Sequence, residues 1–309
     1  MVMTFKTVKE GVPSEIIVET KKEKNSKESV WNYIITYEDK SQMTLSEDDW
    51  KNFKWENEYF FVPYFDSYRT KEYEDSLREQ LKKLDEACDA YDKELPLKFP
   101  QFSYNNIRES LKNAEEKKKL FIERGKLICE LYPFCLPVNI YSGEPLPDYD
   151  YYFTERSDWG WRRIFDEVCD TILNDYKRWT EKERSQFHIY DVKEKFGMLR
   201  ISTSYSSENI NKAISIAEFK SELVCQNCGK TEKDKKGNYI YYKSKGYWIK
   251  YRCKDCAKKE DIEGKAINKI IKGIVKGSAY KKMKTKPEFE VMHWEHGYKR
   301  KETFILEEI

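Results

Sequence analysis

Two Cys-x-x-Cys pairs, CQNC at 225–228 and CKDC at 253–256, constrain the fold of this chain more than any other feature. A zinc ion takes four tetrahedral ligands, and a Cys-x-x-Cys turn brings two thiolates to the same ion. A paired quartet is much more specific for a metal than a single pair, which also occurs in redox proteins. The sequence therefore predicts that one zinc ion is bound by Cys225, Cys228, Cys253 and Cys256.

The residues around the two pairs indicate what kind of zinc module they form. Gly229 follows the first pair and suits the positive-φ residue that closes a cysteine knuckle. The segments GNYIYYK and YWIKYR, on either side of SKG, predict a β-hairpin between the pairs. The second pair opens the amphipathic segment AKKEDIEGKAINKIIKGIVKG, so we expect Cys256 in the first turn of a helix. This order is typical of a treble-clef finger, and a zinc ribbon is the alternative.

The ligand types predict a structural rather than a catalytic zinc ion. Catalytic zinc keeps an open position and usually has histidine or carboxylate ligands, whereas four thiolates close the coordination shell. Treble-clef nucleases of the His-Asn-His type also need a histidine near the knuckle. The three histidines here are His188, His293 and His296, so none lies between residues 189 and 292. The HWEH segment that holds the last two has no third ligand nearby, and we predict no metal there.

The zinc module carries a strong positive charge that the formal net charge of +2 conceals. Residues 220–286 hold 20 lysines and arginines against 7 acidic residues, whereas residues 1–219 hold 34 against 42. Cations interleaved with aromatic rings are typical of nucleic-acid binding, because cations bind phosphates and rings stack on bases. In the alternative, the rings pack a small core and the lysines are merely solvated. The candidate contact residues, for nucleic acid or another partner, are Lys243, Lys245, Tyr247, Trp248, Lys250 and Arg252.

Residue patterns along the chain predict an α+β protein made of five parts. These are a small N-terminal β-rich domain (1–65), a long helical hairpin (66–132), an α/β core (133–223), the basic four-cysteine zinc module (224–286) and a C-terminal tail (287–309). In the first part, EIIVET and VWNYIITYED predict strands, and Ser46 predicts the cap of a helical turn that begins at Glu47.

The hairpin and the core have their own signals. A heptad-like apolar seam, interrupted by Pro96 and Pro100, consists of Leu77, Leu81, Leu84, Cys88 and Tyr91. Such an arm could form a homo-oligomer, dock a partner or pack on its own body. In the core, Asp158 predicts a helix N-cap, and HIYDVKEKFGMLRISTSY predicts two strands around Phe196 and Gly197.

Several classes of protein are disfavoured. No apolar run approaches the roughly 18 residues of a membrane span, and the N-terminus has no signal-peptide core, so we predict a cytoplasmic protein without membrane contact. The chain shows no glycine-rich phosphate loop and no nucleophile motif, which predicts that it is not an enzyme. A site formed only in three dimensions, near Trp159, Trp161 and Lys195, stays the alternative.

The stretch DVKEKFGMLRIS, with DWGWRRIFDEVC upstream and the two cysteine pairs downstream, resembles a family of uncharacterised phage and bacterial proteins. These proteins carry a V-K-E-K-F-G-x-L-R hairpin followed by a four-cysteine zinc finger, and the resemblance covers residues 158–256, about a third of the chain. It implies the same four cysteine ligands and a match at Trp248, but no activity is assigned to the family. A phage setting implies a small non-enzymatic protein, in the host cytoplasm, that binds and inhibits a host protein complex such as an anti-phage defence assembly. DNA or RNA binding through the basic module is the alternative.

Overall fold

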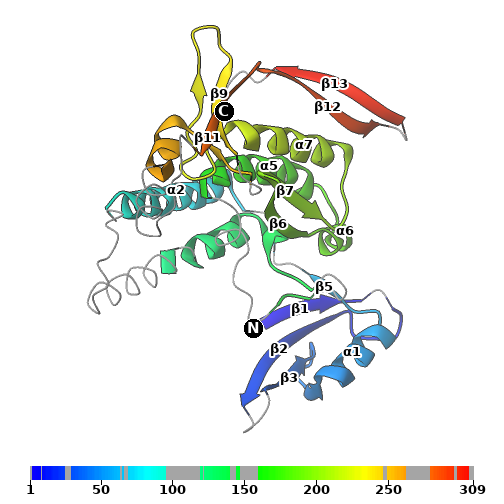
Figure 1. Cartoon of the computed structure of the whole chain (residues 1–309). Coiled ribbons are helices and arrows are strands. Elements are labelled where there is room, and N and C mark those ends of the chain that lie inside the picture. Colours follow the sequence, from blue (N-terminus) through cyan, green and yellow to red (C-terminus); the bar gives the residue numbers. More distant parts are fainter. Residues whose placement is uncertain are drawn as a thin grey trace, which may run out of the picture.

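The computed structural model confirms a mixed α+β protein. It describes residues 2–7, 9–24, 29–62, 65, 69–94, 119–120, 122–139, 144–146, 159–245, 249–261, 279–295 and 298–305. Figure 1 shows a small sheet with one helix at the N-terminal end of the molecule and a helical body in the middle. A lysine-rich sheet, formed by strands between residues 232 and 285, and a last β-hairpin, at residues 288–305, lie at the opposite end.

The N-terminal part is an antiparallel sheet in the strand order β4-β3-β2-β1-β5. Its strands are β1 (Val2–Lys6), β2 (Glu15–Lys24), β3 (Ser29–Thr36), β4 (Gln42–Ser46) and β5 (Phe60–Val62). Helix α1 (Glu47–Glu56) begins as predicted, because the Ser46 side chain accepts a hydrogen bond from the Asp49 backbone N–H. The Trp50 side chain is fully buried, with its ring 5.0 Å from that of Phe5, and this pair forms the centre of a separate apolar core.

The body combines helices with one β-hairpin. Its elements are α2 (Lys71–Glu94), a helix at residues 122–131, the 3-10 turns η1 (Pro133–Cys135) and η2 (Trp159–Trp161), α5 (Arg162–Tyr176), α6 (Glu181–Gln186), β6 (Ile189–Lys195), β7 (Met198–Thr203) and α7 (Glu208–Leu223). The predicted turn between β6 and β7 is confirmed, because Phe196 and Gly197 both have positive φ. The predicted cap at Asp158 lies outside the described residues, and α5 itself begins after η2 without a side-chain cap.

The apolar seam of α2 packs on the body. Leu77 and Leu81 lie in one core cluster with Ile128, Leu131 and the buried face of α5, and Leu84 is half-buried. Among the residues that the structure describes, the seam therefore contributes to the protein's own core. The side chains of Cys88 and Tyr91, and the segment with Pro96 and Pro100, lie outside the described residues.

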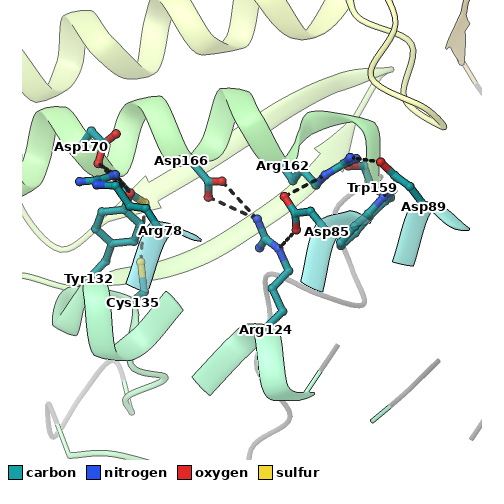
Figure 2. Close-up of polar contacts among 11 residues, drawn as sticks. Arg78, Asp85, Asp89, Arg124, Tyr132, Cys135, Trp159, Arg162, Asp166 and Asp170 are labelled. Atoms are coloured by element: carbon teal, nitrogen blue, oxygen red, sulfur yellow. Dashed lines mark hydrogen bonds and ion pairs between the residues drawn. The ribbon is translucent and has the colours of Figure 1, made fainter. Parts of the chain in front are cut away.

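A buried arginine fixes the two helices of the hairpin to α5 (Figure 2). The Arg124 side chain is 1% exposed, and its Nε donates to Asp85 Oδ1 of α2 at 2.7 Å. Its Nη2 lies 3.2 Å from Asp166 Oδ2 of α5. A buried guanidinium needs such partners, because removing it from water costs several kcal/mol. The three helices are thus joined by charge as well as by apolar contact.

A second arginine extends the same network toward η2 (Figure 2). Arg162 contacts Asp85 at 3.2 Å and Asp89 at 2.6 Å, and its guanidinium lies 4.5 Å from the centre of the Trp159 ring. The Trp159 Nε1 donates to Asp89 at 2.8 Å. Trp159 therefore has a structural place at the start of η2.

The described C-terminal residues hold four strands that sequence patterns did not predict, namely β8 (Glu232–Lys233), β11 (Tyr280–Thr285), β12 (Glu288–Glu295) and β13 (Tyr298–Ile305). The lysine-rich sheet has β8, β9 (Tyr239–Ser244), β10 (Tyr251–Arg252) and β11, with β9 between β10 and β11. Within the predicted C-terminal tail (287–309), β12 and β13 form an antiparallel hairpin. The hairpin is ordered by apolar packing, since the Phe289 ring stacks on Phe219 of α7 at 4.0 Å.

Candidate metal centre

The first cysteine pair lies on a tight knuckle after α7. The Gly229 N–H donates to Cys225 O at 2.8 Å, and the Cys225 N–H donates to Lys230 O at 3.1 Å. Gly229 has φ of +73°, as predicted for the residue that closes the knuckle. This turn places Cys225 and Cys228 on the side that faces the second pair.

The second pair lies where β10 leads into a short helix at residues 254–261. The Ala257 N–H donates to Cys253 O at 3.0 Å, which sets Cys256 in the first helical turn, as predicted. Two backbone-positioned cysteines therefore approach the knuckle from the helix.

The four sulfur atoms form one cluster that fits a metal ion. All lie within 4.8 Å of one another, and Cys228 Sγ is 3.7 Å from the sulfurs of both Cys253 and Cys256. Four sulfurs arranged tetrahedrally at about 2.3 Å from zinc would be about 3.8 Å apart. Hydrogen bonds from Cys228, then from Cys253 and Cys256, lower the pKa of the Cys225 thiol, whereas hydrogen bonds with Cys225 raise the pKa of Cys228 and of Cys253. The predicted cluster is confirmed, and the identity of its metal stays a prediction.

Polar groups around the cluster point donors at sulfur. Asn227 Nδ2 donates to Cys256 Sγ, and the Cys256 N–H donates to Cys253 Sγ, both at 3.5 Å. Such donors stabilise negative charge on ligand sulfurs and orient them. The buried side of the cluster is formed by Cys225 and Cys253, while Cys228 is exposed.

The knuckle is seated directly on η2 through a glycine. The Gly160 N–H donates to Gln226 O at 2.8 Å. A Cβ atom at residue 160 would lie 2.0 Å from Cys225 O and 2.7 Å from Gly229 N, so no side chain fits there. Gly160 of η2 thus forms a backbone cradle for the cysteine cluster, a role that sequence analysis did not identify.

A second glycine joins the β6–β7 turn to the strand before the second cysteine pair. Gly197 has φ of +83°, and a Cβ there would lie 2.5 Å from Ile249 Cγ2 and 2.8 Å from the Tyr251 ring. The buried Gln226 side chain completes the joint. Its Oε1 accepts from the Tyr251 N–H at 2.7 Å and from Arg252 Nη1 at 2.8 Å.

The predicted contact residues fall into three groups. The prediction that Arg252 contacts a partner was wrong. Its side chain is only 7% exposed, and its Nε lies 2.5 Å from Glu260 Oε1, so it forms an ion pair with the helix that follows it. Lys245 and Lys250 are exposed and Lys243 is half-buried, with its Nζ 5.5 Å from the Tyr251 ring centre. Tyr247 and Trp248 lie outside the described residues.

Strand β11 adds cations that sequence analysis did not single out. Lys281, Lys282 and Lys284 all lie on this strand, and Lys281 and Lys282 are exposed. In the antiparallel register, Lys281 lies directly opposite Lys243 of β9. Because a run such as YKKMKT has little apolar alternation, no local signal marks it as a strand.

The remaining cysteines and histidines either lie apart from the quartet or fall outside the residues that the structure describes. Cys135 and Cys169 are buried in the body with their sulfurs 3.7 Å apart, and burial raises the pKa of both thiols. His188 is buried, and burial lowers its pKa. The His293 side chain and His296 lie outside the described residues.

Within the described part of the chain, no helix has the length and apolar character needed to cross a membrane. No protein-family model, curated protein or solved structure matches the chain.

Proposed function

We propose that this chain is a non-enzymatic interaction protein held in shape by a structural zinc ion. The observation that carries this proposal is the four-sulfur cluster seated on Gly160. Four thiolates would fill the coordination shell of zinc and leave no position for a substrate. Zinc would cross-link the knuckle to the helix at residues 254–261. The succession of knuckle, hairpin and helix along the chain would be that of a treble-clef finger. The ion would thereby fix the lysine-rich sheet on the body.

The proposed partner is a host protein complex, such as an anti-phage defence assembly, which the chain would bind and inhibit in the host cytoplasm. This part rests on the resemblance of residues 158–256 to phage and bacterial proteins. The rigid joints at Gly160 and Gly197 support it, because a pre-organised surface binds with a smaller entropy cost.

Two measurements test the proposal. Elemental analysis of the purified chain is expected to give one zinc per chain, with loss in Cys228→Ser and retention in the control Cys129→Ser. Zinc-loaded protein immobilised in host lysate is expected to retain a stoichiometric protein complex, which chelation of the bait releases. A bait that carries zinc yet retains no such complex would contradict the proposed partner.

A second candidate function, nucleic-acid binding, is supported by the lysines of β9 and β11. Lys243 and Lys281 face each other across the strand pair, although like charges directly opposite destabilise a sheet. A polyanion would relieve that repulsion. Titration with DNA and RNA at two salt concentrations tests it, since phosphate contacts require affinity to fall steeply with salt. Absence of binding at low salt eliminates this candidate.

A further inference from the structure

The β6–β7 turn contains a residue that the fold does not favour. Phe196 and Gly197 have φ of +55° and +83°, the two positive values of a type I′ hairpin turn. Asparagine or glycine is preferred at the first of these positions, and a bulky side chain with positive φ is an outlier. Phenylalanine is therefore an unfavourable choice for forming this turn.

Burial of the Phe196 ring offsets little of the conformational cost of its positive φ. Its side chain is 68% exposed, and within the described residues it contacts the ammonium group of Lys195, 5.7 Å from the ring centre. Large apolar side chains normally contribute to stability through buried area. Conformation and burial therefore both disfavour phenylalanine at this position of the fold.

The turn that presents the ring is held rigidly. The Gly197 N–H donates to the Glu194 carboxylate, and Gly197 packs against Ile249 and the ring of Tyr251. Residues 194–197 thus lie on the zinc module and do not project freely. A ring fixed in this way loses little entropy when it contacts a partner.

Cations lie beside this ring and continue along the neighbouring sheet. Tyr251, which touches Gly197, lies opposite Lys243 in the β10–β9 register, and Lys243 lies opposite Lys281 in the β9–β11 register. Directly opposite residues share one face of a sheet. The row Tyr251–Lys243–Lys281 therefore starts at the turn, where Lys195 lies beside Phe196.

Among the described residues, two acidic side chains lie close to these groups: Glu194, which accepts from the Gly197 N–H, and Glu222. Glu222 of α7 is partly buried, and burial raises its pKa against the lowering effects of Lys243 and Arg200. Arg200 is ion-paired with Glu218, so it adds no free positive charge. The row keeps an excess of positive charge beside an exposed ring.

We propose that Phe196 is a stacking anchor for single-stranded nucleic acid, with backbone phosphates on Lys195, Lys243 and Lys281. An unpaired base offers a planar face to the ring, and its neighbouring phosphates match the lysine row. A duplex does not fit this surface equally well, because its bases already stack on each other. This inference rests on the second candidate function and names its ligand and its anchor residue.

The probe is a fluorescein-labelled 20-nucleotide oligothymidylate, titrated with zinc-loaded protein by fluorescence anisotropy at 50 and 200 mM salt. Three phosphate contacts on a single strand predict a log–log salt slope of about −2, or roughly 20-fold weaker binding at the higher salt. Phe196→Asn is expected to weaken binding about 5- to 100-fold at both salts with the slope unchanged, because only stacking is lost. The same substitution should raise the melting temperature, since asparagine suits the turn.

Matched variants separate stacking from charge and from general damage. Lys281→Gln should reduce the salt slope by about 0.7. Trp55→Ala removes an 85% exposed ring from α1 and should leave binding unchanged.

Four outcomes would overturn the inference. One is unchanged binding in Phe196→Asn, and another is a lower melting temperature, which would show that the ring serves the fold. The third is Phe196-dependent binding of polyglutamate without binding of the oligonucleotide, which would assign the surface to an acidic protein. A zinc-loaded chain that binds no oligonucleotide refutes this inference and leaves the proposed host-protein partner to its own test.

Discussion

The contact between Gly160 and the cysteine knuckle predicts a large effect from a single added methyl group. In Gly160→Ala the new Cβ would lie 2.0 Å from Cys225 O, a distance at which the knuckle must move by at least about 1 Å. Overpacking of this kind costs about 1–3 kcal/mol, and loss of the Gly160 N–H to Gln226 O hydrogen bond costs about 1 kcal/mol more. The backbone at residue 160 is not left-handed, so alanine also gains about 0.4–1 kcal/mol from the unfolded state. We expect a net loss of about 2–3 kcal/mol.

The loss should depend on the metal. Chelation frees the knuckle, so the clash should disappear and the variant should match the wild type within about 0.5 kcal/mol. By reciprocity, zinc affinity should fall roughly 30- to 150-fold in Gly160→Ala. Urea unfolding with and without chelator measures the first effect, and competition with a chromogenic zinc chelator measures the second.

Gly11→Ala provides the control for this experiment. Gly11 has φ of +80° but nothing lies within 4 Å of its Cβ position, so alanine should cost about 1–2 kcal/mol whether or not metal is bound. An equal effect of chelator on Gly160→Ala and Gly11→Ala would refute the proposed cradle, as would a Gly160→Ala protein with wild-type stability.

Three further predictions concern the body and the metal. Arg124→Ala should lower the free energy of unfolding by about 3–5 kcal/mol, because it removes the arginine partner of Asp166 and one of the two arginine partners of Asp85, and Arg124→Met combined with Asp166→Asn should recover part of this loss in urea titrations. Burial raises the pKa of Asp166 to about 6, so its contribution to stability is fully present below about pH 4 and is lost as pH rises through 6. The free energy of unfolding of the wild type, relative to that of Asp166→Asn, should therefore fall between pH 4 and pH 7. The fall should be at most about 3 kcal/mol, because the Asp166 side chain is 27% exposed and solvent screens the effect. A rise would contradict the raised pKa of Asp166. Chelation should increase amide exchange across residues 225–256 while residues 2–62, which have their own core, keep their protection, and equal exchange in both regions would argue against separate cores.

Local signals in the sequence were sufficient for several parts of the fold. The Cys-x-x-Cys spacing located the four-cysteine cluster, Ser46 located the start of α1, and Phe196–Gly197 located a hairpin turn. Each of these features is determined by residues that lie within a few positions of one another in the sequence. For such features, sequence and geometry have nearly a one-to-one relation.

Other features depended on distant contacts and could not be predicted in this way. Lysines are depleted in strands, yet β11 forms because its backbone pairs with β9, some forty residues earlier. Arg252 looked like a surface cation but is buried beside Gln226 and Glu260. Nothing in DWGW indicates that Gly160 touches Cys225, because that contact joins segments far apart in the chain.

The position of the cradle has a consequence for how the chain is made. Synthesis runs from the N-terminus, so the elements bearing Gly160 and Gly197, together with α7, leave the ribosome before Cys253 and Cys256 do. The receiving surface for the knuckle can therefore form while only the first cysteine pair is present. The second pair would then complete the ligand set on a surface already assembled. A nascent chain from which Cys228 has emerged and Cys253 has not would hold a docked knuckle with two free thiols, the stage at which oxidation competes most directly with metal capture.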